Sequence, residues 1–363
     1  MSNEAQKHNN LFDFVETVSG DKTLRVEENL GEGFVRLRVA EAERRQAKHD
    51  IRCSEDVIVE MLRNSRDAGA QHIYVATARD RDMRSIVILD DGQGIPEYMQ
   101  EKVFDARVTS KLESMHMDRW GVHGRGMALY SIKENSDEAR VMSSGLGKGT
   151  SIRIVTDTTR LSERADQSTW PQIGTDDEGA QSVVRGPHNI VRTCCEFALE
   201  ERPQVSVYLG SPAEIVATIR SRVRSEIDET ELLFIDSLEF LPVLHRLYAA
   251  ADAIDLQEVS RSLGLDISER TAHRILAHQI KPQRSVIAQL THSTDDLGAH
   301  EVDLLKDRRG LKLSQDDLDD FSRLLERDFE LIAKRYYVSL AGQPKIRVSK
   351  NRISVSFEID KDD

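Results

Sequence analysis

The chain has 363 residues, of which 31% are charged and 39% hydrophobic, and it carries a formal net charge of −13. These values indicate a water-soluble chain of two or three domains, and the acidic balance excludes a nucleic-acid surface that extends over the whole molecule. The three cysteines have no metal-binding or disulfide spacing, and no run of about 18 apolar residues could span a membrane. Because the polar N-terminus lacks a signal-peptide pattern, we expect a cytoplasmic location.

The first part of the chain is mostly polar. Residues 1–30 form an N-terminal arm with one short apolar patch at 11–15, which is typical either of an arm that reaches a partner or of a disordered tail. Residues 35–52 are rich in Arg and Lys, and we expect them to form a helix with a solvated charged face.

A helix with one apolar and one polar face is predicted to follow from Ser54, a typical N-cap residue. Its apolar stripe consists of Val57, Ile58, Met61 and Leu62. At about 100° per residue, Glu60, Asn64 and Asp67 fall within a sector of roughly 60° on another face. Packing rarely needs two carboxylates and an amide on one narrow face, so this face is a candidate functional site. The alternative is a capped helix with a solvated polar face.

Two glycine-rich segments come next. The first, residues 90–94, directly follows the apolar run 86–89, which is predicted as a buried strand. A carboxylate beside glycines at a strand end can accept hydrogen bonds from a flat ligand that lies close to the backbone. The second segment, residues 121–126, opens an apolar helix, and free N–H groups before a helix start favour phosphate binding.

In this order, the motifs resemble the GHKL superfamily of Bergerat-fold ATPases over roughly residues 26–157. The run from Asn64 to Ala70 and the Thr109-Ser110-Lys111 motif are most similar to the mismatch-repair MutL proteins and the B subunits of type IIB topoisomerases. The Gly121-x2-Gly124-x-Gly126 motif fits topoisomerases and heat-shock chaperones better than MutL. The matching motifs are Glu60-x3-Asn64-x2-Asp67-x-Gly69-Ala70, Asp90-x-Gly92-x-Gly94, Thr109-Ser110-Lys111, Gly121-x2-Gly124-x-Gly126 and Gly149-Thr150.

The resemblance implies a site for ATP and Mg²⁺. Glu60 would be the general base that activates water, and Asn64 would be a ligand of the Mg²⁺. Asp90 would accept a hydrogen bond from the adenine amino group, with Thr150 supporting that contact. Lys111 would act in catalysis from a mobile lid, and the remaining nucleotide-binding residues would be Asp67, Gly92, Gly94, Thr109, Ser110, Gly121, His123, Gly124 and Gly126.

The resemblance also implies an α+β fold. We expect the ATP-binding domain to be a Bergerat-fold two-layer α/β sandwich, in which a mixed sheet carries helices on one face. The polar segment that follows it lacks periodicity and is predicted as a linker. The chain then divides into an N-terminal arm at 1–30, the ATP-binding domain at 31–157, the linker at 158–182, and a mixed helical and α/β C-terminal region at 183–363.

Within the C-terminal region, residues 255–280 resemble a helix-turn-helix whose second helix begins after Ser268. Residues 256–284 could therefore contact DNA, although a purely structural helical hairpin has the same pattern. Residues 261–284 contain five basic and two acidic residues, a local charge of +3: Arg261, Arg270, Arg274, Lys281 and Arg284 against Asp266 and Glu269.

Another short pattern, Gln343-Pro-Lys345, matches the loop from which gyrase-like relatives bring a lysine to the γ-phosphate. A three-residue match also arises by chance, so the sequence leaves the role of Lys345 open.

Together these features predict a Mg²⁺-dependent ATPase that forms a homodimer on nucleotide binding and works as a switch or clamp, associated with DNA as in topoisomerases or repair proteins. The alternative is a chaperone-like or signalling ATPase whose C-terminal half binds a protein partner. A histidine kinase is disfavoured, because it needs a phosphoacceptor histidine on a preceding dimerisation helix. No contact with a membrane is expected.

Overall fold

The computed structural model describes residues 26–38, 41–109, 116–118, 121–123, 126–164, 167–175, 181–224, 237–295, 318, 321–322, 325–326, 329, 333, 338–349 and 352–361. The chain forms two compact units, residues 1–290 and residues 291–363. No helix in the described part of the chain is long and apolar enough to cross a membrane.

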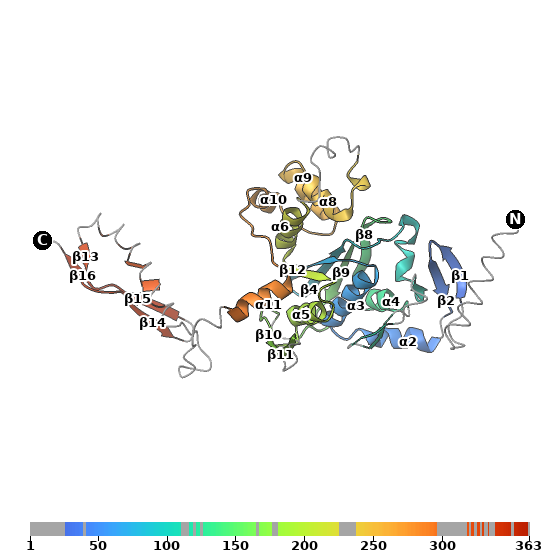
Figure 1. Ribbon diagram of the computed structural model, residues 1–363, viewed down its shortest axis with the longest axis horizontal. Coiled ribbons are helices and arrows are strands. Elements are labelled where there is room, and N and C mark those ends of the chain that lie inside the picture. Colours follow the sequence, from blue (N-terminus) through green and yellow to red (C-terminus); the bar gives the residue numbers. More distant parts are fainter. Residues whose placement is uncertain are drawn as a thin grey trace. The chain divides into compact units, whose positions relative to one another are not determined.

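A mixed sheet of five strands organises the first unit (Figure 1). In its central hairpin, Asp80 pairs with Met83 across the turn. Of these five strands, the one that comes last in the sequence, residues 206–210, pairs parallel to its neighbour, and the other pairs in this sheet are antiparallel. In spatial order the strands are β12 (Ser206–Gly210), β3 (His72–Asp80), β4 (Met83–Asp90), β9 (Thr150–Asp157) and β8 (Glu138–Ser144).

Successive residues of the central strands are apolar, and both faces of the sheet are buried. On β3, Ile73 and Val75 belong to one core, whereas Tyr74 and Ala76 belong to the other. This follows from the strand geometry, in which neighbouring side chains point to opposite faces. A run such as 86–89 therefore needs helices on both sides.

The helices that cover the first face include α3 (Ser54–Asp67), α4 (Ala128–Asn135) and α5 (Ile190–Glu200). Each contributes fully buried residues to a common core with the strands, such as Ile58, Ile132 and Phe197. This mixed sheet with packed helices confirms the α+β fold and the Bergerat-type layer pair.

The second face is covered by helices from further along the chain (Figure 1). They are α6 (Pro212–Val223), α8 (Val243–Ala249), α9 (Ala253–Ser262) and α10 (Glu269–Leu276). Their apolar residues enclose Tyr74 and Leu89 of the sheet. Helices from the predicted C-terminal region thus add a third layer to the predicted two.

The described residues of the predicted linker, 158–164, 167–175 and 181–182, also belong to this unit. Leu161 is buried in the core of the first face, and the carboxylate of Glu163 accepts hydrogen bonds from the buried Arg84. The strand β10 (Gln172–Thr175) pairs with β11 (Gln181–Arg185). The predicted boundaries at 157 and 183 therefore do not separate compact units, because the polar residues of this segment satisfy buried charges.

Shorter elements complete the first unit. Residues 34–37 form a strand, so the helix expected over 35–52 begins only at Glu41. The remaining elements are β1 (Val26–Gly31), β2 (Phe34–Leu37), α2 (Glu41–Asp50), η1 (Glu97–Met99), η2 (Lys102–Phe104), β5 (Val108–Thr109), β6 (His116–Asp118), β7 (Gly121–His123), η3 (Leu238–Phe240) and α11 (Val286–Asp295), which continues past the unit boundary.

The second unit contains two antiparallel strand pairs among its described residues. β13 (Val338–Leu340) pairs with β16 (Ile359–Lys361), and β14 (Lys345–Ser349) pairs with β15 (Arg352–Ser356). Residues 1–25 of the predicted arm lie outside the described part of the chain, as does most of the segment between 296 and 337.

Candidate functional site

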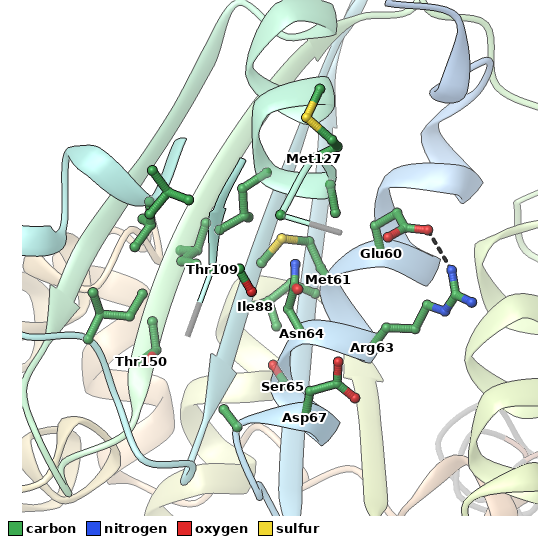
Figure 2. A pocket seen from close by; sticks show the side chains of 18 of the residues that line it. Glu60, Met61, Arg63, Asn64, Ser65, Asp67, Ile88, Thr109, Met127 and Thr150 are labelled. Carbon is green, nitrogen blue, oxygen red and sulfur yellow. Dashed lines mark hydrogen bonds and ion pairs between the residues drawn. The ribbon is translucent and has the colours of Figure 1, made fainter. Parts of the chain in front are cut away.

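A cavity of about 1210 Å³ lies beside the polar face of α3 (Figure 2). Its walls come from α3, from β4 and β9, from the start of α4 and from β5. The structure brings eight of the residues predicted for the site to these walls: Glu60, Asn64, Asp67, Asp90, Gly94, Thr109, Gly126 and Thr150.

The N-terminus of α3 differs from the prediction. Ser54 is the first helical residue and Cys53 is the N-cap, with no side-chain cap. The prediction of Ser54 as the cap was wrong, because a contact from another part of the chain replaces a local cap. The N–H of Ser54 donates to the carbonyl of Ser162 at 3.2 Å, and the carboxylate of Glu55 accepts from the side chain of Gln167 at 2.6 Å.

The polar face of α3 carries ion pairs that the sequence analysis did not identify. Arg63 Nη1 lies 2.8 Å from Glu60 Oε1, and Arg66 Nε lies 2.9 Å from Asp67 Oδ1. Arg66 also binds the carboxylate of Glu201 at 2.8 Å. The sequence could have predicted the pair of Glu60 with Arg63, since side chains at i and i+3 are neighbours on a helix.

Asn64 differs from these charged residues in its hydrogen bonding. Its amide Nδ2 atom is buried and has no hydrogen-bond partner among the described residues. Figure 2 shows the side chain between Thr109 and Asp67. A buried amide group without a partner is costly in a folded chain, so a ligand in the cavity would supply a contact that the protein lacks.

Asp90, at the end of β4, is a buried carboxylate that also lines the cavity. Its Oδ2 accepts from Ser65 Oγ at 2.7 Å, and its Oδ1 accepts from the N–H of Gly92 at 3.0 Å. Burial raises the pKa of Asp90 to about 6, although the hydrogen bonds from Ser65 and Gly92 lower it. Thr150 faces Asp90 across the β4–β9 pair. Ser65 is a site residue that the sequence analysis missed, and it lies next to Asn64 in the motif.

The glycines near Asp90 are required by packing of the chain on itself. A Cβ atom on Gly94 would lie 1.9 Å from the carbonyl oxygen of Gly145, and one on Gly149 would lie 2.1 Å from that of Asp90. The N–H of Gly149 donates to the carbonyl of Gly92 at 3.0 Å. The turn before β9 is therefore packed directly against this wall. Contact of Gly92 and Gly94 with a nucleotide stays a prediction.

The predicted lid is described in part. Gly126 has a φ of +68° and lies at the cavity wall before α4, where helix N–H groups point toward a ligand. Thr109 lines the cavity from β5. Gly121 and His123 belong to β7, whereas Ser110, Lys111 and Gly124 lie outside the described residues.

The helix-turn-helix pattern corresponds to α9 and α10. Ser268 caps α10 by accepting from the N–H of Thr271 at 3.2 Å, as predicted. Gly264 forms the turn, and Ser151 of β9 donates to the neighbouring carbonyl of Leu263 at 2.7 Å. The hairpin is therefore docked on the sheet.

All five basic residues counted in the hairpin segment are exposed, and the acidic Asp266 is paired with Arg153 at 2.6 Å. The remaining predicted contact, Lys345, belongs to the second unit, where it pairs with Glu358.

Comparison with known proteins agrees with this geometry. Residues 51–181 match the family model of the histidine kinase-, DNA gyrase B- and HSP90-like ATPases. A DNA mismatch repair protein MutL from Phocaeicola vulgatus is 36% identical over 102 residues, and one from Parabacteroides distasonis is 33% identical over 102 residues. Each match covers 27% of this chain and 16% of the relative, so the chain matches a small part of those proteins.

Proposed function

Through residues 51–181 the chain belongs to the GHKL superfamily of ATPases, and we propose that it binds ATP in the cavity beside α3 and hydrolyses it to ADP and phosphate. One observation carries this proposal. A buried carboxylate, Asp90, and the polar face of α3 line the same cavity. The carboxylate of Asp90 fits the adenine of ATP. The polar face of α3 fits the phosphates, a metal ion and the attacking water.

Asp90 is proposed to recognise adenine. An ionised carboxylate is only an acceptor, and the exocyclic amino group of adenine is a donor. Ser65 and Gly92 fix the two oxygens of Asp90, so the acceptor is held in place before the ligand arrives. Thr150 would support the contact from β9. A buried polar group that is matched by one ligand discriminates strongly against ligands that lack the donor.

Asn64 fits the Mg²⁺ ligand that the resemblance implies. Mg²⁺ prefers oxygen ligands and is usually held by one or two protein groups together with substrate phosphates. Asn64 offers an amide oxygen at the cavity wall, and its Nδ2 has no partner in the described chain. When bound, the ion would neutralise charge on the phosphates. Gly126 and the N-terminus of α4 would donate N–H groups to the phosphates.

Glu60 is proposed to be the general base. It lines the cavity from α3, and its carboxylate is one-fifth exposed. A base must reach the water whose proton it takes, and this position on the polar face, one helical turn from Asn64, satisfies that requirement. Lys111 and the other residues of the lid would act from the part of the site outside the described residues.

A Glu60→Ala variant tests the proposal. Because a general base typically contributes about 10² to 10⁴ in rate, turnover is expected to fall at least about 10²-fold while ATP affinity is retained. Phosphate release and calorimetry would measure the two quantities. Glu97→Ala is the matched control, since Glu97 is exposed on η1 and does not line the cavity. Wild-type turnover in Glu60→Ala would remove Glu60 from the mechanism.

We further propose that ATP binding closes two copies of the chain into a dimeric switch or clamp that acts on DNA. The exposed basic residues of α9 and α10 support contact with DNA phosphates, since lysines and arginines supply most of the non-specific affinity for DNA. The relatives are named as DNA mismatch repair proteins, which supports the same partner. The alternative is a protein partner, which the acidic net charge of −13 favours.

A further inference from the structure

We propose that Arg63 is a positioning residue for ATP hydrolysis, whose guanidinium holds the carboxylate of Glu60 in the orientation that accepts a proton from water. This inference rests on the proposed function of the cavity. It adds a role for a residue that the motif itself does not specify, since Arg63 is one of the three x positions of Glu60-x3-Asn64.

The two side chains form a close ion pair inside the cavity. Arg63 Nη1 lies 2.8 Å from Glu60 Oε1, and both residues line the cavity. The side chain of Arg63 is only 3% exposed, whereas that of Glu60 is 20% exposed. Figure 2 shows the carboxylate of Glu60 turned toward Arg63. The arginine is thus the buried partner, and the glutamate is the one that reaches the open space.

A buried arginine constrains its partner more than an exposed one. The guanidinium cannot lose its proton, so it requires an anion or acceptors around it. In a site of low dielectric the pair is also stronger than on the surface. The rotamers of Glu60 are therefore restricted, because its Oε1 is bound to Arg63.

This arrangement fits the chemistry of hydrolysis. The oxygen of the attacking water bonds to the γ-phosphorus, the bond from that phosphorus to the ADP oxygen breaks, and a proton of the water passes to Glu60. A base that is free to rotate spends less time within about 2.6–3.2 Å of the water, which lowers the rate without weakening nucleotide binding. Arg63 therefore acts through Glu60 and not on ATP.

A double-mutant cycle in the full chain tests this coupling. Single-turnover rates and ATP affinities would be measured for the wild type, Arg63→Gln, Glu60→Gln and the double variant. Arg63→Gln is expected to lower the rate by about tenfold or more with ATP affinity within about twofold. In the Glu60→Gln background the same change is expected to have no further effect, because the residue on which Arg63 acts is already lost.

Two further variants separate positioning from folding. Arg63→Lys keeps the charge, and we expect it to recover part of the rate. Arg84→Gln removes another buried arginine that pairs with a glutamate, Glu163, away from the cavity, and we expect its effect to be limited to stability. These variants keep the test decisive even if Arg63→Gln is poorly folded.

Four outcomes would overturn the proposal. An unchanged rate in Arg63→Gln would exclude a role in hydrolysis, and equal losses with and without Glu60 would indicate a purely structural residue. A loss of ATP affinity at unchanged rate would make Arg63 a substrate ligand instead. If the wild-type chain neither bound nor hydrolysed ATP, both the proposed function and the role of Arg63 would be contradicted. If the wild type hydrolysed ATP and Arg63→Gln did so at the same rate, only the role of Arg63 would be contradicted.

Discussion

Asp90 is the residue at which burial and ligand recognition are most closely linked. Burial raises its pKa to about 6 from an ordinary 3.8, so it holds a proton in the folded chain over a range in which a free aspartate is ionised. Its contribution to stability is therefore present below pH 3.8 and is lost as the pH rises through about 6. Removal of this charge should not destabilise the chain at neutral pH.

The same shift predicts a pH dependence of ATP affinity. As the pH falls through about 6, Asp90 becomes protonated and loses the acceptor that the adenine amino group needs. We expect affinity to fall on the acid side of that value, measured by calorimetry between about pH 5 and pH 8. An Asp90→Asn variant serves as the reference for protonation of ATP itself. Identical pH profiles in the two proteins would contradict this role.

Much of the residue-level pattern was predictable, because it depends on local periods. Glu60 and Asn64 share a helical face, and Asp90 follows a buried strand, whereas the resemblance to the GHKL superfamily implied that they meet at one site. Arg63 and Ser65 were not identified, since the direction of a side chain depends on its neighbours. Ser54 was mistaken for a cap because Ser162, which binds its N–H, is distant in sequence.

At the scale of elements, the hairpin of α9 and α10 has two separate surfaces. One side is buried against the sheet through residues such as Leu263, which is fully buried. The other side carries exposed Arg270 and Arg274 on α10. Both helices and the glycine turn were predictable from sequence. Their docking on β9 was not predictable. Apolar residues on both faces of the strands indicate that a second layer of helices exists, but they do not indicate which segment of the chain forms it.

The exposed side of α10 predicts salt-dependent DNA binding. Replacing Arg270 and Arg274 by Ala should flatten the plot of log K against log salt by about one unit for each lost phosphate contact. Fluorescence anisotropy with a duplex probe would measure it, and ATP turnover without DNA should be unchanged. The matched control is Arg44→Ala with Arg45→Ala on α2, where two exposed arginines are removed elsewhere. Equal slopes in both variants, or no binding at about 50 mM salt, would favour a protein partner.

At the scale of the whole molecule, the division of the chain was the least predictable feature. Composition suggested a linker at 158–182, yet the compact unit continues to residue 290. Polar sequence does not distinguish a solvated linker from a segment whose side chains bind buried charges, as Glu163 binds Arg84. The strand β12 likewise joins the sheet from far along the chain, through a parallel pairing that no local pattern specifies.

Nucleotide-dependent dimerisation is the prediction that belongs to this scale. A non-hydrolysable ATP analogue is expected to double the mass measured by light scattering, and deletion of residues 1–25 is expected to weaken the change. Asp90→Asn is the control, because a chain that binds the analogue more weakly should stay monomeric at an analogue concentration that just saturates the wild type. A mass that does not respond to the analogue would replace the clamp with a monomeric switch.

The central claim is that this cavity binds ATP through Asp90, and a calorimetric titration of ATP with Mg²⁺ into the full chain tests it most directly. The wild type is expected to bind one ATP per chain. Because a hydrogen bond to a charged group contributes roughly 1.5–3 kcal/mol, Asp90→Asn should bind about 10- to 100-fold more weakly while its thermal stability at pH 8 is retained. Equal affinities in the two proteins, or no binding by the wild type, would contradict the assignment.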